Sequence, residues 1–116
     1  MTKVYLAGSY SGNTIEFLNN IRRGIRVGTT LILKGYAPFV PWLDHQLFLQ
    51  LREEENISLE MICEYSLEWL KVSDCMLVLP NSESSIGTQK EIAIAKKLSI
   101  PVFYEMKELT NCTNVH

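Results

Sequence analysis

Short apolar runs alternate along the chain with longer segments in which apolar residues recur at helical spacing. Runs of this length, bounded by glycine, proline or polar residues, are typical of buried strands. They predict four strands, at residues 4–7, 36–41, 75–79 and 100–104. The helical spacing predicts three helices, at residues 13–34, 58–72 and 88–98. Strands that alternate with helices in this way favour a parallel sheet with right-handed crossovers.

Local signals support several of these boundaries. Asn13 followed by Glu16 is a capping box that opens the first helix, and Lys34-Gly35 is a typical stop. Ser58 is a suitable N-cap for the second helix. Residues 42–56 resist assignment, and the tail after Lys107 is expected to be weakly ordered.

The expected architecture is therefore α/β, a Rossmann-like or flavodoxin-like three-layer sandwich with a four- or five-stranded parallel sheet. One domain would occupy residues 1–107, followed by a C-terminal tail at 108–116. Ligands of such sheets bind beyond the carboxyl ends of the strands. This rule brings the loops at residues 8–12 and 80–88 to one crevice.

Composition narrows the class of protein. The chain has 116 residues and a formal charge of −2, which disfavours binding to nucleic acid or to a membrane surface. Its cysteines, Cys63, Cys75 and Cys112, lack CxxC spacing and indicate neither a zinc site nor a disulfide framework. The start of the sequence lacks the pattern of a signal peptide, so a reducing cytoplasm is the expected compartment.

Two loops carry the candidate chemistry. In the first, Gly8 and Gly12 would let the backbone approach a ligand, although a tight strand-to-helix turn is the more common reason for such glycines. The second offers serine and threonine hydroxyls and Gly87 before a helix, with Glu91 one turn inside. An ionised glutamate held there could act as a nucleophile or base. The alternative is structural, because Thr88 and Glu91 also form a capping box.

These residues resemble a known group of enzymes. The patterns Tyr5-x-x-Gly8-Ser9 and Ser85-x-Gly87-Thr88-x-x-Glu91-x-Ala93, with the strand at 75–79, are similar to the nucleoside 2-deoxyribosyltransferase superfamily. The segment 38–41, Pro-Phe-Val-Pro, is typical of its small branch. The segment 66–70 ahead of Asp74 also resembles the 2'-deoxynucleoside 5'-phosphate N-hydrolases. The resemblance extends from Lys3 to about Tyr104.

The resemblance implies a site and a reaction. Glu91 would attack C1' of the sugar and displace the base, and Tyr5 would orient its carboxylate. Serine at position 85, where an acid would repel a phosphate, implies a 5'-monophosphate substrate. The implied substrate-binding residues are Gly8, Ser9, Tyr10, Ser11, Gly12, Ser66, Ser85, Gly87 and Thr88.

Trp42 and His45 are candidate base contacts, although a tryptophan after a strand is more often part of the core and a lone histidine is usually structural. The partner implied by the resemblance is a nucleoside or nucleotide, without metal or organic cofactor. A homodimer or larger homo-oligomer is also implied.

Two departures from the pattern leave the activity open. Ser66 stands where the family has an aspartate that protonates the leaving base, and Ser11 replaces an arginine of the hydrolases. Asp44 or His45 could supply the acid if residues 42–56 fold over the crevice. Otherwise the chain would be a nucleotide sensor or sequestering protein without turnover, or an interaction module without a ligand.

Overall fold

A computed structural model describes residues 1–10 and 12–113. The strands are β1 (Lys3–Ala7), β2 (Ala37–Phe39), β3 (Cys75–Val78) and β4 (Val102–Phe103). The helices are α1 (Thr14–Leu33), α2 (Asp44–Phe48), α3 (Leu59–Lys71), α4 (Ile86–Lys97) and α5 (Met106–Thr113), with a 3₁₀ turn, η1, at Pro41–Leu43.

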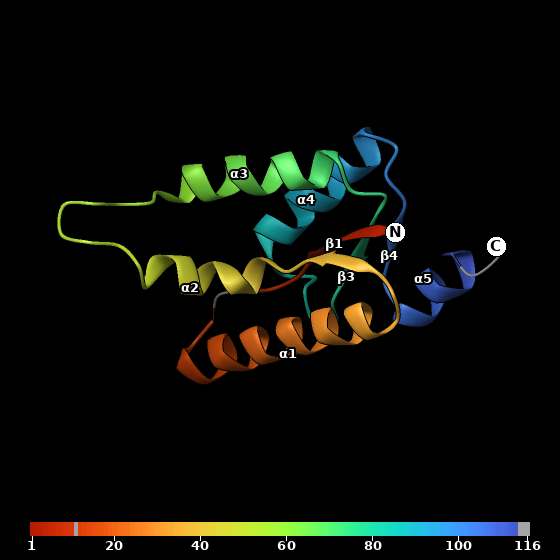
Figure 1. Cartoon of the computed structure of the whole chain (residues 1–116), viewed down its shortest axis with the longest axis horizontal. Coiled ribbons are helices and arrows are strands. Elements are labelled where there is room, and N and C mark those ends of the chain that lie inside the picture. Colours follow the sequence, from red (N-terminus) through yellow and green to blue (C-terminus); the bar gives the residue numbers. More distant parts are fainter. Residues whose placement is uncertain (11, 114–116) are drawn as a thin grey trace.

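Within the described residues, the strands form one parallel sheet in the order β2-β1-β3-β4. Helices α3 and α4 cover one face, and α1 and α5 cover the other (Figure 1). The predicted three-layer α/β architecture with a parallel sheet is confirmed, and the sheet has four strands.

Side chains along the central strands point alternately to the two faces of the sheet, so the core consists of two clusters. Val4 and Leu6 face α1 and α5, where they pack with Leu31 and Leu109. Tyr5 and its neighbours on β3 face α3 and α4 instead, in a second cluster that contains Tyr5, Ala7, Leu70, Met76, Val78, Ile92 and Ala95. Since successive strand residues point to opposite faces, β1 places the Tyr5 side chain under α4.

Most predicted helix ends agree with the structure. Asn13 Oδ1 accepts a 3.0 Å hydrogen bond from the Glu16 amide, and Ser58 Oγ accepts one of 3.1 Å from the Met61 amide. Gly35, with φ of 91°, ends α1 in a conformation that favours glycine. The start of the last predicted helix was wrong. Helix α4 begins at Ile86 and its N-cap is Ser85, not Thr88.

The segment that resisted assignment folds as η1 followed by α2. Trp42 anchors it, with only 2% of its surface exposed and its ring against the backbone of α1. A Cβ added to Gly24 would lie 2.1 Å from the indole ring, so the contact requires glycine. The contact between Trp42 and Gly24, which are distant in the sequence, fixes the direction in which this segment leaves β2.

The expectation of weak order after Lys107 was wrong for the described part of the tail. Residues Met106–Thr113 form α5, and Leu109 is fully buried in the core. Residues 114–116 of the predicted tail lie outside the described residues. None of the helices in the described parts of the chain is both long and apolar enough to cross a lipid bilayer.

We predict that Gly24→Ala destabilises the protein by about 2 kcal/mol or more. The overlap with Trp42 outweighs the gain of up to about 1 kcal/mol that alanine brings to a helix. Urea unfolding of Gly24→Ala and wild type measures the difference. Gly87→Ala is the matched control, since a Cβ on Gly87 would have no neighbour within 4 Å. Equal stability of Gly24→Ala and Gly87→Ala would contradict the assigned contact.

Candidate functional site

The two candidate loops meet at the carboxyl ends of β1 and β3, as the topology predicts. The Ser9 amide donates a 3.1 Å hydrogen bond to Ser82 Oγ, and Ser9 Oγ donates one of 3.1 Å to the Asn81 carbonyl. Ser82 is buried, which makes this junction part of the folded core. The two loops therefore lie side by side at one end of the sheet.

Tyr5 and Glu91 face each other between β1 and α4. On α4, Thr88, Glu91, Ile92 and Ala95 share one helical face, and three of them are buried against the sheet. Tyr5 points to the same side from β1, and its Oη donates a hydrogen bond to Glu91 Oε2. A strand and a helix separated by a large stretch of sequence thus bring a phenol and a carboxyl together.

The electrostatics of this pair follow from its burial. Burial raises the pKa of Glu91 to about 7, although the hydrogen bond from Tyr5 favours the charged form. The pKa of Tyr5 is raised well above its ordinary value, first by burial and then by the charge of Glu91. Tyr5 therefore remains a neutral donor, while Glu91 can gain or lose a proton near neutral pH.

The structural alternative for Glu91, a capping box with Thr88, does not match this geometry. Ser85 is the N-cap, and its Oγ accepts hydrogen bonds from the Thr88 amide (3.2 Å) and from Thr88 Oγ1 (2.9 Å). Glu91 lies in the second turn of α4, beyond the reach of a capping role. Its carboxyl instead contacts Tyr5 from the core-facing side of the helix.

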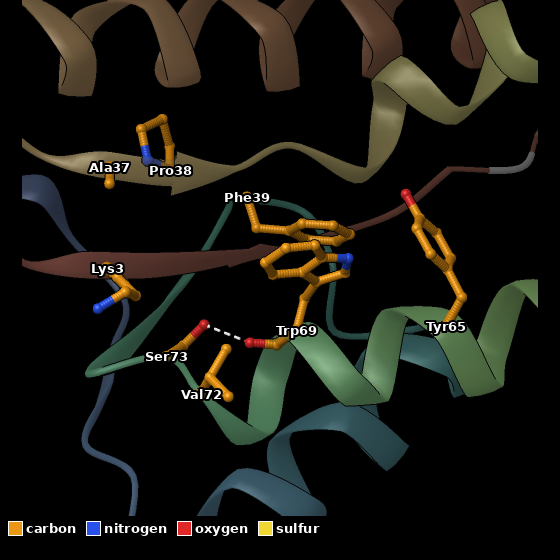
Figure 2. Close-up of a pocket in the computed structure, with 8 residues that line it drawn as sticks. All are labelled: Lys3, Ala37, Pro38, Phe39, Tyr65, Trp69, Val72 and Ser73. Carbon is orange, nitrogen blue, oxygen red and sulfur yellow. Dashed lines mark hydrogen bonds between the residues drawn. The ribbon is translucent and has the colours of Figure 1, made fainter.

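Aromatic rings hold Tyr5 in place from the side of α3. Phe39 stacks on Tyr5 with ring centroids 5.1 Å apart, and Trp69 stacks on Phe39 at 6.2 Å. Phe39 and Trp69 also border an open hollow of about 540 Å³ between α3 and the edge strand β2, shown in Figure 2. The stack covers one side of the Tyr5 ring, which restricts the directions in which its hydroxyl can point.

Ser66, which replaces the aspartate of the family, and Asp44, a candidate substitute for it, lie on different helices. Ser66 is buried, and a polar interaction with its hydroxyl lowers the pKa of Tyr5. Asp44 is also buried, at the first residue of α2, and accepts a 2.7 Å hydrogen bond from Tyr65 Oη. Sequence reasoning missed Tyr65 and Phe39, because only the packing of α3 over β2 brings their rings together, at 5.9 Å.

The remaining predicted residues divide between core and surface. Trp42 lies in the core, so its ring is covered by protein and is not free to stack on a base. Its Nε1 donates a 3.1 Å hydrogen bond to the Ser9 carbonyl. Gly8 packs against that indole, and His45 contacts Phe17 edge to face. Gly12 and Gly87 are exposed, and Ser11 lies outside the described residues.

Tyr10 contributes an unusual group. Its ring packs against the core and meets Phe17 edge to face. Its hydroxyl is buried and has no hydrogen-bond partner within the described residues. As for metals, the described parts of the chain contain no group of three or more His, Cys, Asp or Glu side chains able to hold an ion.

Comparison with solved structures agrees with the architecture. The fold is similar to that of a 2-deoxyribosyltransferase from the psychrotolerant bacterium Bacillus psychrosaccharolyticus, with a TM-score of 0.61 and 24% identity over 87% of this chain and 69% of that one. It is also similar to a conserved protein from Enterococcus faecalis V583, with a TM-score of 0.57 and 23% identity over 88% of this chain. The alignment covers 61% of the length of the latter protein.

The resemblance to nucleoside 2-deoxyribosyltransferases that the sequence predicts is thus confirmed at the level of the fold. No curated protein matches the chain. A family model described as "Domain of unknown function (DUF7768)" matches residues 2–105, nearly the whole of the described structure. The chain therefore belongs to the DUF7768 family and has the fold of a 2-deoxyribosyltransferase.

Proposed function

We propose that the protein cleaves or transfers the N-glycosidic bond of a (deoxy)nucleoside 5'-monophosphate, with Glu91 as the nucleophile. The observation that carries the proposal is the hydrogen bond from Tyr5 to Glu91. Within the described residues, the hydrogen bond to this partly buried carboxyl comes from a neutral phenol, and such a carboxyl keeps the reactivity that a salt bridge would remove. The 2-deoxyribosyltransferase whose fold this chain shares supports the same substrate class.

In the proposed reaction, Glu91 acts in two steps. Since Tyr5 binds Oε2, Oε1 is the oxygen that attacks C1', and the C1'–N bond breaks with its electron pair passing to the base. A glycosyl-enzyme ester results. Water then attacks C1', the ester bond breaks, and Glu91 is regenerated as a carboxylate. If a second base attacks instead of water, the outcome is transfer.

The start of α4 suits a phosphate. The first-turn amides of a helix and its dipole favour anions, and Gly87 leaves the approach open. Ser85 accepts two hydrogen bonds within the helix cap, so its own hydroxyl proton remains available for a phosphate oxygen. The absence of a carboxylate at this position supports a monophosphate over a free nucleoside.

We predict that Glu91→Gln and Glu91→Ala each lower base release by about three orders of magnitude or more, because both lack the attacking carboxylate. Chromatography of free base after incubation with a panel of nucleosides and their 5'-monophosphates measures this. Glu53→Gln, in an exposed loop, is the control and retains activity. Base release that survives in both Glu91 variants contradicts the nucleophile. Tight binding without base release by wild type would indicate a nucleotide-binding protein instead.

Ser85→Asp tests the substrate class. Aspartate caps helices as well as serine does, so the fold is retained while a negative charge faces the phosphate site. We expect kcat/KM for the 5'-monophosphate to fall by about 10-fold or more, with a much smaller change for the free nucleoside. Ser58→Asp, the same change at the N-cap of α3, is the matched control and leaves both values unchanged. Equal losses for both substrates would contradict a phosphate site at Ser85.

The pKa of Glu91 predicts how stability depends on pH. The folded protein holds this proton up to about pH 7, whereas the unfolded chain releases it near the ordinary value of 4.5. The stabilising contribution is therefore complete below about pH 4.5 and is lost as the pH rises through about 7. Relative to Glu91→Gln, which cannot titrate, wild type should lose on the order of 2–3 kcal/mol between pH 4 and pH 8.

Urea unfolding of both proteins at several pH values measures this difference. Glu53→Gln serves again as the control, since it should follow the pH dependence of wild type. A constant difference between wild type and Glu91→Gln across the range would show that the Glu91 carboxyl titrates at its ordinary pKa.

A further inference from the structure

The proposed reaction lacks one group, a proton donor for the departing base. A base that leaves C1' takes an electron pair onto a ring nitrogen, and it leaves slowly as an anion unless that nitrogen or another gains a proton. The Ser66 hydroxyl is a poor acid for this purpose. Another side chain near Tyr5 and Glu91 must therefore supply the proton.

Packed side chains connect the Asp44 carboxyl to the Tyr5 and Glu91 pair. Tyr65 binds Asp44 Oδ1, the Tyr65 ring meets Phe39 edge to face at 5.9 Å, and Phe39 stacks on Tyr5 at 5.1 Å. In Figure 2 the Tyr65 side chain projects from α3 to the same side as Trp69, toward the ribbons of the sheet. The negative charge of Asp44 also raises the pKa of Tyr5 and of Tyr10, so both phenols lie within its field.

The surroundings of Asp44 shift its carboxyl toward the protonated form. Its side chain is buried, and burial raises its pKa, against the hydrogen bond from Tyr65, which lowers it. Among the described residues the salt bridge found is the exposed pair Lys71 and Glu68, so no cation neutralises Asp44. A buried carboxyl without a cation reduces its desolvation cost by holding a proton.

An orphan polar group beside Asp44 points to a ligand. The Tyr10 hydroxyl is buried and has no partner within the described residues, and its pKa is raised by burial and by Asp44. A buried hydroxyl without a hydrogen bond is costly, and it is satisfied when a bound molecule offers a polar atom. Asp44 and Tyr10 are therefore two buried polar groups close enough to interact, one at the start of α2 and one in the first loop.

We propose that Asp44 is the acid that protonates the leaving base, and that Tyr65 is its positioning residue. The inference rests on the proposed function. As the C1'–N bond breaks, its electron pair passes to the base, and the proton on the Asp44 carboxyl moves to a ring nitrogen. Tyr65 then stabilises the new carboxylate through its hydrogen bond. In the second step the attacking water returns a proton to Asp44, which restores the acid.

The test compares two leaving groups. A purine deoxynucleoside 5'-monophosphate needs a proton when its base departs, whereas its N7-methylated derivative carries a positive charge and releases a neutral base without one. We expect Asp44→Asn to lower kcat for the first substrate by about 10²–10⁴-fold and for the second by less than about threefold. Tyr65→Phe should lower kcat for the first substrate by about 10-fold and leave the second unchanged.

Controls separate this inference from the proposed function. Asp74→Asn, the same substitution at an exposed aspartate before β3, should match wild type on both substrates. Glu91→Gln should lose both activities. If Asp44→Asn loses both substrates equally, or neither, Asp44 is not the acid although the proposed function stands. If wild type releases base from neither substrate, the proposed function fails, and the inference fails with it.

Discussion

The packing of Trp42 against Gly24 is the contact on which the position of the site depends. The indole ring lies directly on the backbone of α1, its Nε1 binds the Ser9 carbonyl, and its edge meets Gly8. One side chain therefore fixes the first helix, the first loop and the turn η1 relative to one another. Asp44 follows two residues later, so the same contact determines where that carboxyl lies.

Phenols, in place of cations, accompany the buried Asp44 and the partly buried Glu91. Tyr5 donates to Glu91 and Tyr65 donates to Asp44. A neutral donor stabilises an ionised carboxylate less than an arginine or lysine would, so burial keeps the pKa of each carboxyl above its ordinary value. Glu91 can then exchange a proton near neutral pH, and the pKa of Asp44 moves in the same direction. Phe39 joins the two pairs through its contacts with both tyrosine rings.

The fold was largely predictable from the sequence because its signals are local. The caps Asn13 and Ser58 each act within one helical turn, and the buried strands are continuous apolar runs. Helix α5 was missed because Met106 and Leu109 are its main apolar contacts, which is too little to reveal a helical face. The core position of Trp42 and the pairing of Asp44 with Tyr65 depend on contacts between distant segments, which no local pattern encodes. Tyr5 and Glu91 could be placed at one crevice from topology, but not in hydrogen-bond contact.

The sheet ends in two very short edge strands. Strand β2 has three residues and contains Pro38, and β4 has two residues and directly follows Pro101. A proline offers no amide hydrogen, and a strand of two or three residues gives little backbone for pairing with another chain. These edges protect the protein against amyloid-like aggregation. They also mean that self-association would have to use side chains of the helices or of the aromatic hollow, since the sheet cannot readily continue from one molecule into the next.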